Sequence, residues 1–158
     1  MTDAVLPFFV YGTLLPGERN HDLFLRGRTS AEQPAVLPGA LLYEGPGYPY
    51  AIEGHGTVHG ALVTAGPGSY GELLGLLDHL EEYLGPDHPR NLYERVVRQV
   101  IPGPEPAEVT PGPEPAVPVR AWVYFAAPAV TRTLRTGGTP IPSGAWLTRR
   151  PPPAPRTP

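Results

Sequence analysis

The chain has 158 residues and a formal net charge of −3 at pH 7, a length that suits one domain with its own hydrophobic core. It contains no cysteine and no lysine, which excludes disulfides, thiolate metal sites, a cysteine nucleophile and Schiff-base chemistry. The mild negative charge argues against a nucleic-acid partner, which usually requires a basic face.

Other features that the sequence lacks limit where we expect the protein to be located and which reactions it can catalyse. The sequence has no apolar run of about 18 residues and no secretory signal at its N-terminus, so we expect a cytoplasmic protein that does not associate with a membrane. Its three serines all lie outside the Gly-x-Ser-x-Gly pattern of a nucleophile elbow. The chemistry that remains is acid–base catalysis by Asp, Glu, His or Tyr, or a metal held by His and carboxylates.

Strand patterns dominate the chain. They cover residues 6–11, 35–43, 57–64, 93–101 and 119–125, with a shorter extended piece at 50–53. Pro38-Gly39 interrupts the second strand and indicates a β-bulge. A short helix is expected over residues 21–26, capped by Asn20 and stopped by Gly27. Because parallel βαβ repetition is absent, the pattern predicts an α+β fold with a small closed or partly closed sheet.

The long helix of the sequence is predicted over residues 70–84. Ser69, followed three residues later by Glu72, forms a capping-box pattern at its start, and Gly85-Pro86 ends it. At about 100° per residue, its apolar face consists of Tyr70, Leu73, Leu74, Leu77, Leu80 and Leu84.

Glu81 is the charged exception on this apolar face. It lies about 40° from Leu77, whereas Glu82 lies about 140° away and is expected to be exposed. A carboxylate on a core-facing stripe is costly unless it is paired or functional, and burial raises its pKa toward the range of a proton shuttle. Two interpretations stay open: a catalytic acid–base, or a structural glutamate that pairs with an arginine such as Arg95.

The strand at residues 6–11 runs directly into a glycine-bearing loop, Tyr11-Gly12-Thr13-Leu14. Glycine tolerates backbone conformations and close approaches that other residues do not. Consecutive backbone N–H groups in such a loop can form a concave anion-binding site. The loop is therefore a candidate substrate-binding element.

Tyr11-Gly12-Thr13-Leu14 and Asp78-x-x-Glu81 together resemble the motifs of the γ-glutamylcyclotransferase-like family, which includes γ-glutamylamine cyclotransferases and plant AIG2-like proteins. The resemblance covers about residues 7–147. Further similar segments follow in the family's order: Gly47-Tyr48-Pro49, Val58-x-Gly60, Tyr93-x-Arg95, Trp122-x-Tyr124 and Ile141-Pro142-Ser143-Gly144-Ala145-Trp146-Leu147.

The resemblance implies a small mixed β-barrel with flanking helices and an intramolecular aminolysis. The substrate's own α-amine would attack its γ-carbonyl carbon and release 5-oxoproline and an amine or amino acid. Glu81 would accept the α-ammonium proton and deliver one to the leaving nitrogen. Tyr11, Gly12, Thr13 and Leu14 would hold the glutamyl group through backbone N–H groups. No cofactor or metal is implied, and the partner would be a small γ-glutamyl molecule.

The sequence also departs from the family pattern. Glu82 stands where many members have glycine, Ala61 stands where a glutamate is common, and the link from Tyr83 to Leu92 is long. These departures leave the leaving group open. Two alternatives therefore remain beside a general γ-glutamyl cyclotransferase: a noncatalytic ligand-binding or interaction protein of the same fold, and a biosynthetic enzyme that removes a γ-glutamyl group from a larger product.

Other polar residues have competing interpretations. His55-x-x-x-His59 has a spacing that could hold a metal, but we expect it to be polar surface. Tyr93 is a candidate substrate-binding residue, although for it and for Tyr124 we favour a place in the core or barrel wall over a direct catalytic role. Asp78 is expected to support Glu81 without acting itself.

Proline and glycine divide the chain into a domain and two irregular segments. We expect a single domain over residues 5–147, interrupted by a Pro-rich insertion loop at 102–118, and a disordered Pro-rich tail at 148–158. Either segment could bind a partner, but their composition favours solvated chain. The sequence does not indicate an oligomeric state.

Overall fold

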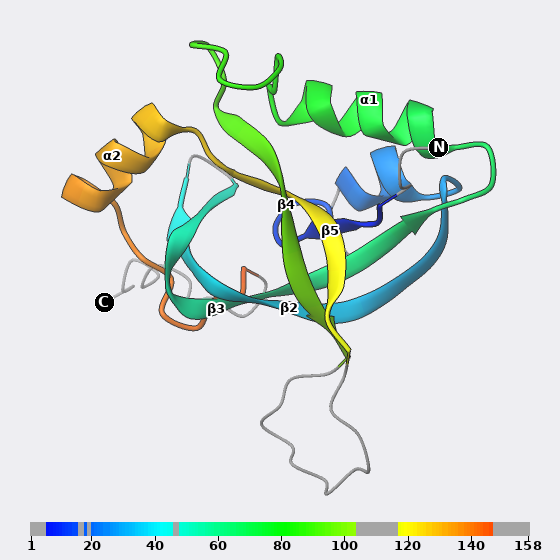
Figure 1. The fold of residues 1–158 in the computed structure, drawn as a ribbon, viewed down its shortest axis with the longest axis horizontal. Coiled ribbons are helices and arrows are strands. Elements are labelled where there is room, and N and C mark those ends of the chain that lie inside the picture. Colours follow the sequence, from blue (N-terminus) through cyan, green and yellow to red (C-terminus); the bar gives the residue numbers. More distant parts are fainter. Residues whose placement is uncertain (1–5, 16–17, 19, 46–47, 104–116, 147–158) are drawn as a thin grey trace, which may run out of the picture.

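The computed structural model describes residues 6–15, 18, 20–45, 48–103 and 117–146. Five strands form a closed barrel in the order β1-β3-β2-β4-β5 (Figure 1). The strands are β1 Phe8–Val10, β2 Thr29–Glu44, β3 Pro49–Ala65, β4 Tyr93–Pro102 and β5 Val119–Ala126. The helical elements are η1 His21–Leu25, α1 Tyr70–Leu80 and α2 Pro128–Gly137.

The short strand β1 closes the barrel. It pairs antiparallel with β3, where Phe9 lies opposite Leu62, and parallel with β5, where Phe9 lies opposite Val123. The remaining neighbours, β2–β3, β2–β4 and β4–β5, are antiparallel. The barrel is therefore mixed, as the family resemblance implied, and the prediction of an α+β barrel with flanking helices is confirmed.

The long β2–β3 hairpin supplies most of the barrel wall. Its register shifts between Pro38 and Ala40, and Gly39 has a φ of +77°, so the predicted bulge is confirmed. The prediction of separate pieces at 50–53 and 57–64 was wrong, because β3 is continuous. Gly54 and Gly56 lower strand propensity locally, but a side chain at either position would collide with Leu41 of β2.

Helix α1 lies along one side of the barrel (Figure 1) and buries Leu73 and Leu77 against it. It ends at Leu80, four residues earlier than predicted, and Leu84 is 59% exposed. The cause is the chain reversal that follows, where Glu82 has a φ of +52°.

The predicted capping box at the start of α1 was also wrong. Ser69 makes no side-chain cap hydrogen bond, although its carbonyl accepts the N–H of Leu73. The carboxylate of Glu72 lies 3.6 Å from the guanidinium of Arg28. This tertiary ion pair replaces the local bond that the sequence pattern suggested.

The smaller helices differ from the sequence-based expectation. η1 is a single π-helical turn, and the Asn20 side chain donates to the Thr13 hydroxyl at 2.9 Å without capping the turn. Gly27 follows with a φ of +83°, as expected of a stop signal. Helix α2 was not predicted, although Pro128 in its first turn is a start signal. It packs beside β3, where Arg135 donates to the Glu53 carbonyl at 3.2 Å.

The predicted insertion and tail lie largely outside the part of the chain that the structure describes, as does Val5. The domain boundaries and the disordered tail at 148–158 therefore stay predictions. In the described part of the chain, no helix is long and apolar enough to cross a membrane.

The surroundings of two glycines, one on the barrel and one on α1, allow a prediction about stability. A Cβ at Gly60 would collide with the Val10 carbonyl of β1, so Gly60→Ala should lower the free energy of unfolding by about 3 kcal/mol or more. Gly75 on α1 is exposed with open space around it, so Gly75→Ala should raise that free energy by about 0.5–1 kcal/mol. Urea unfolding checks both variants, and equal effects would contradict the assigned β1–β3 contact.

Candidate active site

A pocket opens where β1 leaves the barrel. The space between its walls, counted together with the open solvent at its mouth, is about 340 Å³. Segments far apart in the sequence contribute to it: the loop after β1, the start of β3, the end of α1, the start of β4 and the end of β5. The lining residues are Phe9, Val10, Tyr11, Gly12, Thr13, Leu14, Tyr48, Pro49, Glu81, Tyr93 and Tyr124. All six candidate site residues therefore share one pocket.

Glu81 is the acidic residue of this lining. It is the C-cap residue of α1, and its N–H donates to the Leu77 carbonyl at 2.9 Å. The carboxyl is partly buried, and burial raises its pKa from 4.5 to about 8. Arg95, the suggested partner, pairs with Asp78 instead. The carboxyl of Glu81 is thus mainly protonated at neutral pH and can exchange a proton near that pH.

The loop after β1 approaches the start of β3 closely. A Cβ at Gly12 would lie 2.6 Å from the Pro49 ring, while Gly12 is not among the residues with positive φ. Of the two reasons for glycine that the sequence offered, close approach applies here and a special backbone conformation does not. The Gly12 carbonyl accepts the N–H of Leu15 at 3.0 Å. Within the described chain, no hydrogen bond occupies the N–H groups of Gly12, Thr13 and Leu14.

Buried tyrosines fix the walls of the pocket. The Tyr11 hydroxyl donates to the Tyr124 carbonyl at 2.5 Å and accepts the Ala51 N–H at 3.2 Å. The Tyr93 hydroxyl donates to the Pro49 carbonyl at 2.6 Å. Burial raises the pKa of both hydroxyls above the usual range, so they remain protonated donors. These bonds join the loop, β3, β4 and β5 around Glu81.

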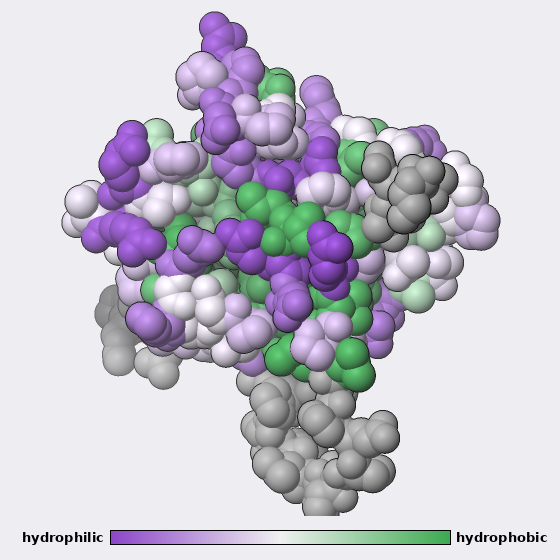
Figure 2. Space-filling model, in the orientation of Figure 1, coloured by the Kyte–Doolittle hydropathy of each residue, from purple (hydrophilic) through white to green (hydrophobic). Residues whose placement is uncertain are grey.

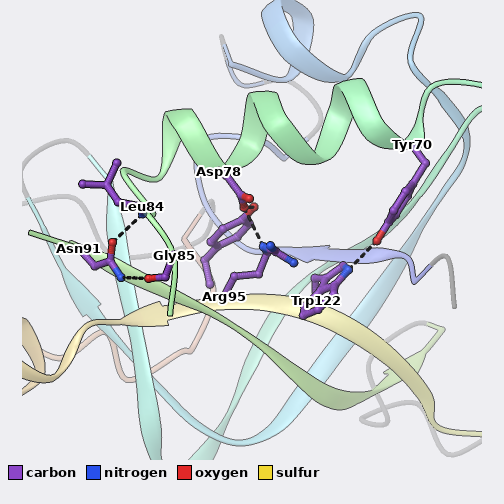
Figure 3. Close-up of polar contacts among 8 residues, drawn as sticks. Tyr70, Asp78, Leu84, Gly85, Asn91, Arg95 and Trp122 are labelled. Atoms are coloured by element: carbon purple, nitrogen blue, oxygen red, sulfur yellow. Dashed lines mark hydrogen bonds and ion pairs between the residues drawn. The ribbon is translucent and has the colours of Figure 1, made fainter. Parts of the chain in front are cut away.

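Asp78 anchors the outer wall behind the pocket (Figure 3). One of its carboxylate oxygens accepts the Tyr124 hydroxyl at 2.5 Å and the Arg95 Nε at 2.8 Å. The Arg95 guanidinium also lies 4.3 Å from the ring centre of Trp122, whose indole donates to Tyr70. Asp78 thus ties α1 to β4 and β5. These contacts are structural, and the support of Glu81 that the sequence led us to expect stays a prediction.

Sequence reasoning missed Asn91, a buried polar residue in the loop between α1 and β4. Its carbonyl oxygen accepts the Leu84 N–H at 2.7 Å, and its amide donates to the Gly85 carbonyl at 2.8 Å (Figure 3). The same amide also donates to the Glu94 carboxylate at 2.8 Å. This side chain holds together the long link that departs from the family pattern. An asparagine between helix and strand is a turn signal, but its partners come from both flanks of the loop.

The histidines do not join the pocket. His55 is exposed on β3, and His59 lies farther along the same strand, paired in a bridge with Ala145. Within the described residues, no group of three His, Cys, Asp or Glu side chains gathers closely enough to hold a metal ion.

The fold and this pocket define a small barrel protein that places a partly buried glutamic acid in one pocket with a glycine-bearing loop. Residues 8–148 match the family described as "Gamma-glutamyl cyclotransferase, AIG2-like". The chain belongs to this family.

Individual relatives agree with the family assignment. The chain is 38% identical over 92 residues to the gamma-L-glutamyl-butirosin B gamma-glutamyl cyclotransferase of Niallia circulans. That match spans 58% of this chain and 56% of the relative, about half the relative's length.

Two solved structures share the fold at low identity. An uncharacterized protein from Pyrococcus horikoshii is 21% identical with a TM-score of 0.53, over 89% of each chain. An AIG2-like protein from Mus musculus is 22% identical with a TM-score of 0.54, over 78% of this chain and 80% of its own.

The raised pKa of Glu81 makes stability depend on pH. The folded protein holds this proton up to about pH 8, whereas the unfolded chain releases it near 4.5. The free energy of unfolding therefore falls as the pH rises from about 4.5 to about 8. Glu81→Gln removes this loss of stability, because glutamine does not ionise. Urea unfolding should show the advantage of Glu81→Gln over the wild type growing by roughly 2–4 kcal/mol between pH 5 and pH 9.

Glu82→Gln is the matched control, because this neighbouring glutamate is exposed. Its stability difference from the wild type should stay nearly constant over the same range. A constant difference for Glu81→Gln as well would show that the Glu81 carboxyl is not desolvated.

Proposed function

We propose that this protein is a γ-glutamyl cyclotransferase that needs no cofactor, with Glu81 as its acid–base. The observation that carries the proposal is the position of the Glu81 carboxyl, whose pKa is about 8, in the same pocket as the backbone of residues 11–14. Membership of the family and the named activity of the Niallia circulans relative support it.

In the proposed reaction the substrate supplies its own nucleophile. Ionised Glu81 takes a proton from the α-ammonium group, and the freed amine attacks the γ-carbonyl carbon. The new C–N bond closes the 5-oxoproline ring, and the bond to the leaving nitrogen breaks as Glu81 returns the proton to it. The ring nitrogen then gives up its second proton through Glu81 to the released amine, which leaves as an ammonium ion. Atoms and charges balance without water or a cofactor. Proximity of amine and carbonyl within one molecule supplies much of the acceleration.

The loop after β1 would bind the negative charge in this reaction. The N–H groups of Gly12, Thr13 and Leu14 have no protein acceptor in the described chain, so they are available to a carboxylate or to the developing oxyanion. Tyr11 and Tyr93 would position the glutamyl group through the walls that they hold together. The substrate class follows from this chemistry: a γ-glutamyl amide with a free α-amine.

A second candidate is a narrower version of the same reaction. The name of the Niallia circulans relative specifies a γ-glutamylated product as its substrate. This chain could likewise remove a γ-glutamyl group from a larger amine. A panel of small and large γ-glutamyl amides would separate the two, because the narrower enzyme would leave the small amides intact.

The activity test measures 5-oxoproline released from a γ-glutamylamine, a γ-glutamyl amino acid and glutathione. We expect turnover of the γ-glutamylamine, and Glu81→Gln should lower kcat by about 10²- to 10⁴-fold. Glu72→Gln, an exposed glutamate in the first turn of α1, serves as the control and should keep wild-type activity. Full activity in Glu81→Gln would exclude the mechanism, and no turnover of any γ-glutamyl compound would favour a noncatalytic binding protein.

The pH dependence follows from the same carboxyl. Glu81 must be ionised to accept the first proton, so kcat/KM should fall tenfold per pH unit below about pH 8. The bound α-ammonium favours the ionised carboxylate, so the corresponding limb of kcat should lie at lower pH. Rate measurements from pH 5 to 10 check both limbs. Coincident limbs near the ordinary pKa of glutamate would contradict the assignment.

A further inference from the structure

Glu81 lies inside a Schellman turn, the hydrogen-bonded reversal that ends α1. Glu81 is the C-cap residue of the helix. Two residues later, the N–H of Tyr83 donates to the Asp78 carbonyl at 2.9 Å. Between them, the N–H of Glu82 donates to the His79 carbonyl at 3.2 Å. These two bonds define the motif, so the direction of the Glu81 side chain depends on the closure of this turn.

The residues of the turn favour its closure less than the usual residues of the motif would. The residue after the C-cap adopts a left-handed conformation, for which glycine is the common choice. Here it is Glu82, with a φ of +52°, and a residue with a Cβ atom is less stable in that conformation than glycine. An apolar contact often joins the two ends of the motif, but one end is occupied by the charged Asp78. The turn therefore gains from stabilisation by another element.

Arg95 of β4 contacts both ends of the turn. Its Nε donates to the Asp78 carboxylate at 2.8 Å (Figure 3), and its guanidinium carbon lies 5.1 Å from the centre of the Tyr83 ring. The same guanidinium lies 4.3 Å from the ring centre of Trp122, which holds it against the barrel wall. The Arg95 side chain is 15% exposed, so these contacts are largely shielded from water. One barrel residue thus joins the first and last residues of the turn.

Arg95 stands apart from the pocket itself. It is not among the described residues that line the pocket, and its ion-pair partner is Asp78. The group in the pocket that depends on the turn is the Glu81 carboxyl. A proton carrier must lie within hydrogen-bond reach of the substrate nitrogen, and a displacement of about 1 Å can slow a reaction by about 100-fold.

We infer that Arg95 is a positioning residue for Glu81: by binding Asp78 and Tyr83 together, it closes the turn that directs the Glu81 carboxyl into the pocket. This inference rests on the proposed cyclotransferase function and extends it to a residue outside the pocket. Loss of Arg95 lets the turn open and misplaces the proton carrier, which lowers kcat. KM stays nearly constant, because the loop after β1 binds the glutamyl group in the proposed reaction.

The first test compares two arginines of β4 by the release of 5-oxoproline from a γ-glutamylamine. Arg95→Gln should lower kcat by about tenfold and leave KM within about twofold of the wild type. The kcat values are taken at the plateau of the pH profile, so that a change in the pKa of Glu81 does not contribute. Arg98→Gln is the matched control and should keep the wild-type kcat. Arg98 also combines an ion pair with a ring contact, but its partners are Glu53 at 2.7 Å and Phe125 at 5.2 Å.

The second test is rescue of Arg95→Gln by glycine at the left-handed position. Adding Glu82→Gly should raise the kcat of Arg95→Gln by about threefold or more, because glycine favours the closed turn. Adding Glu82→Gln, which removes the charge and keeps the Cβ atom, should not raise it. Adding Gly75→Ala, which stabilises α1 away from the turn, should not raise it either.

Urea unfolding shows whether each variant is folded under the assay conditions. If Arg95→Gln does not fold, Tyr83→Leu replaces it in both tests, because it removes only the ring contact and should lower kcat by about threefold. Wild-type kcat in the variant, a rise in KM without a fall in kcat, or equal rescue by Gly75→Ala and Glu82→Gly would overturn the inference. No turnover by the wild-type protein would instead overturn the proposed function on which it rests.

Discussion

The three-residue strand β1 is the constraint on which the site depends. It lies between β3 and β5 and completes the barrel, with Phe9 opposite both Leu62 and Val123. Gly60 on β3 lets the β1 backbone approach without collision. Because the chain leaves the barrel immediately after Val10, the position of the pocket loop is set by a strand that is bonded on both edges.

Helix α1 brings the acid to this loop through packing on the same strands. Phe8 contacts Tyr70 at the start of α1, and Asp78 near its end binds β4 and β5 through Arg95 and Tyr124. These contacts fix the position of the last helical residues relative to the loop that follows β1. Hydrophobic residues gather over the crossing of β4 and β5, with hydrophilic residues among them (Figure 2). The side chain of Asp78 on α1 therefore forms its hydrogen bonds with strands whose outer surface is largely hydrophobic.

The environment of Glu81 differs from that of its neighbour Glu82 in a way that raises the pKa of Glu81. The carboxyl sits just beyond the last helical turn, where burial raises its pKa while the neighbouring Glu82 stays exposed. Two adjacent glutamates thus have different surroundings because the chain turns between them. This difference supports the proposed acid–base role of Glu81.

The sequence by itself determined the approximate positions of the strands, although not the continuity of β3, because strand patterns depend on local periodicity. It likewise determined the bulge at Gly39, the fold class and the family, the last through motifs in a fixed order. It also singled out Glu81 among apolar neighbours, although the helical geometry used for that argument ends at Leu80. Only the tertiary structure decided that Gly12 is required by the Pro49 ring, that Arg95 pairs with Asp78 and that Asn91 holds the loop after α1. Those partners are distant in sequence, and their contacts exist only once the barrel has closed.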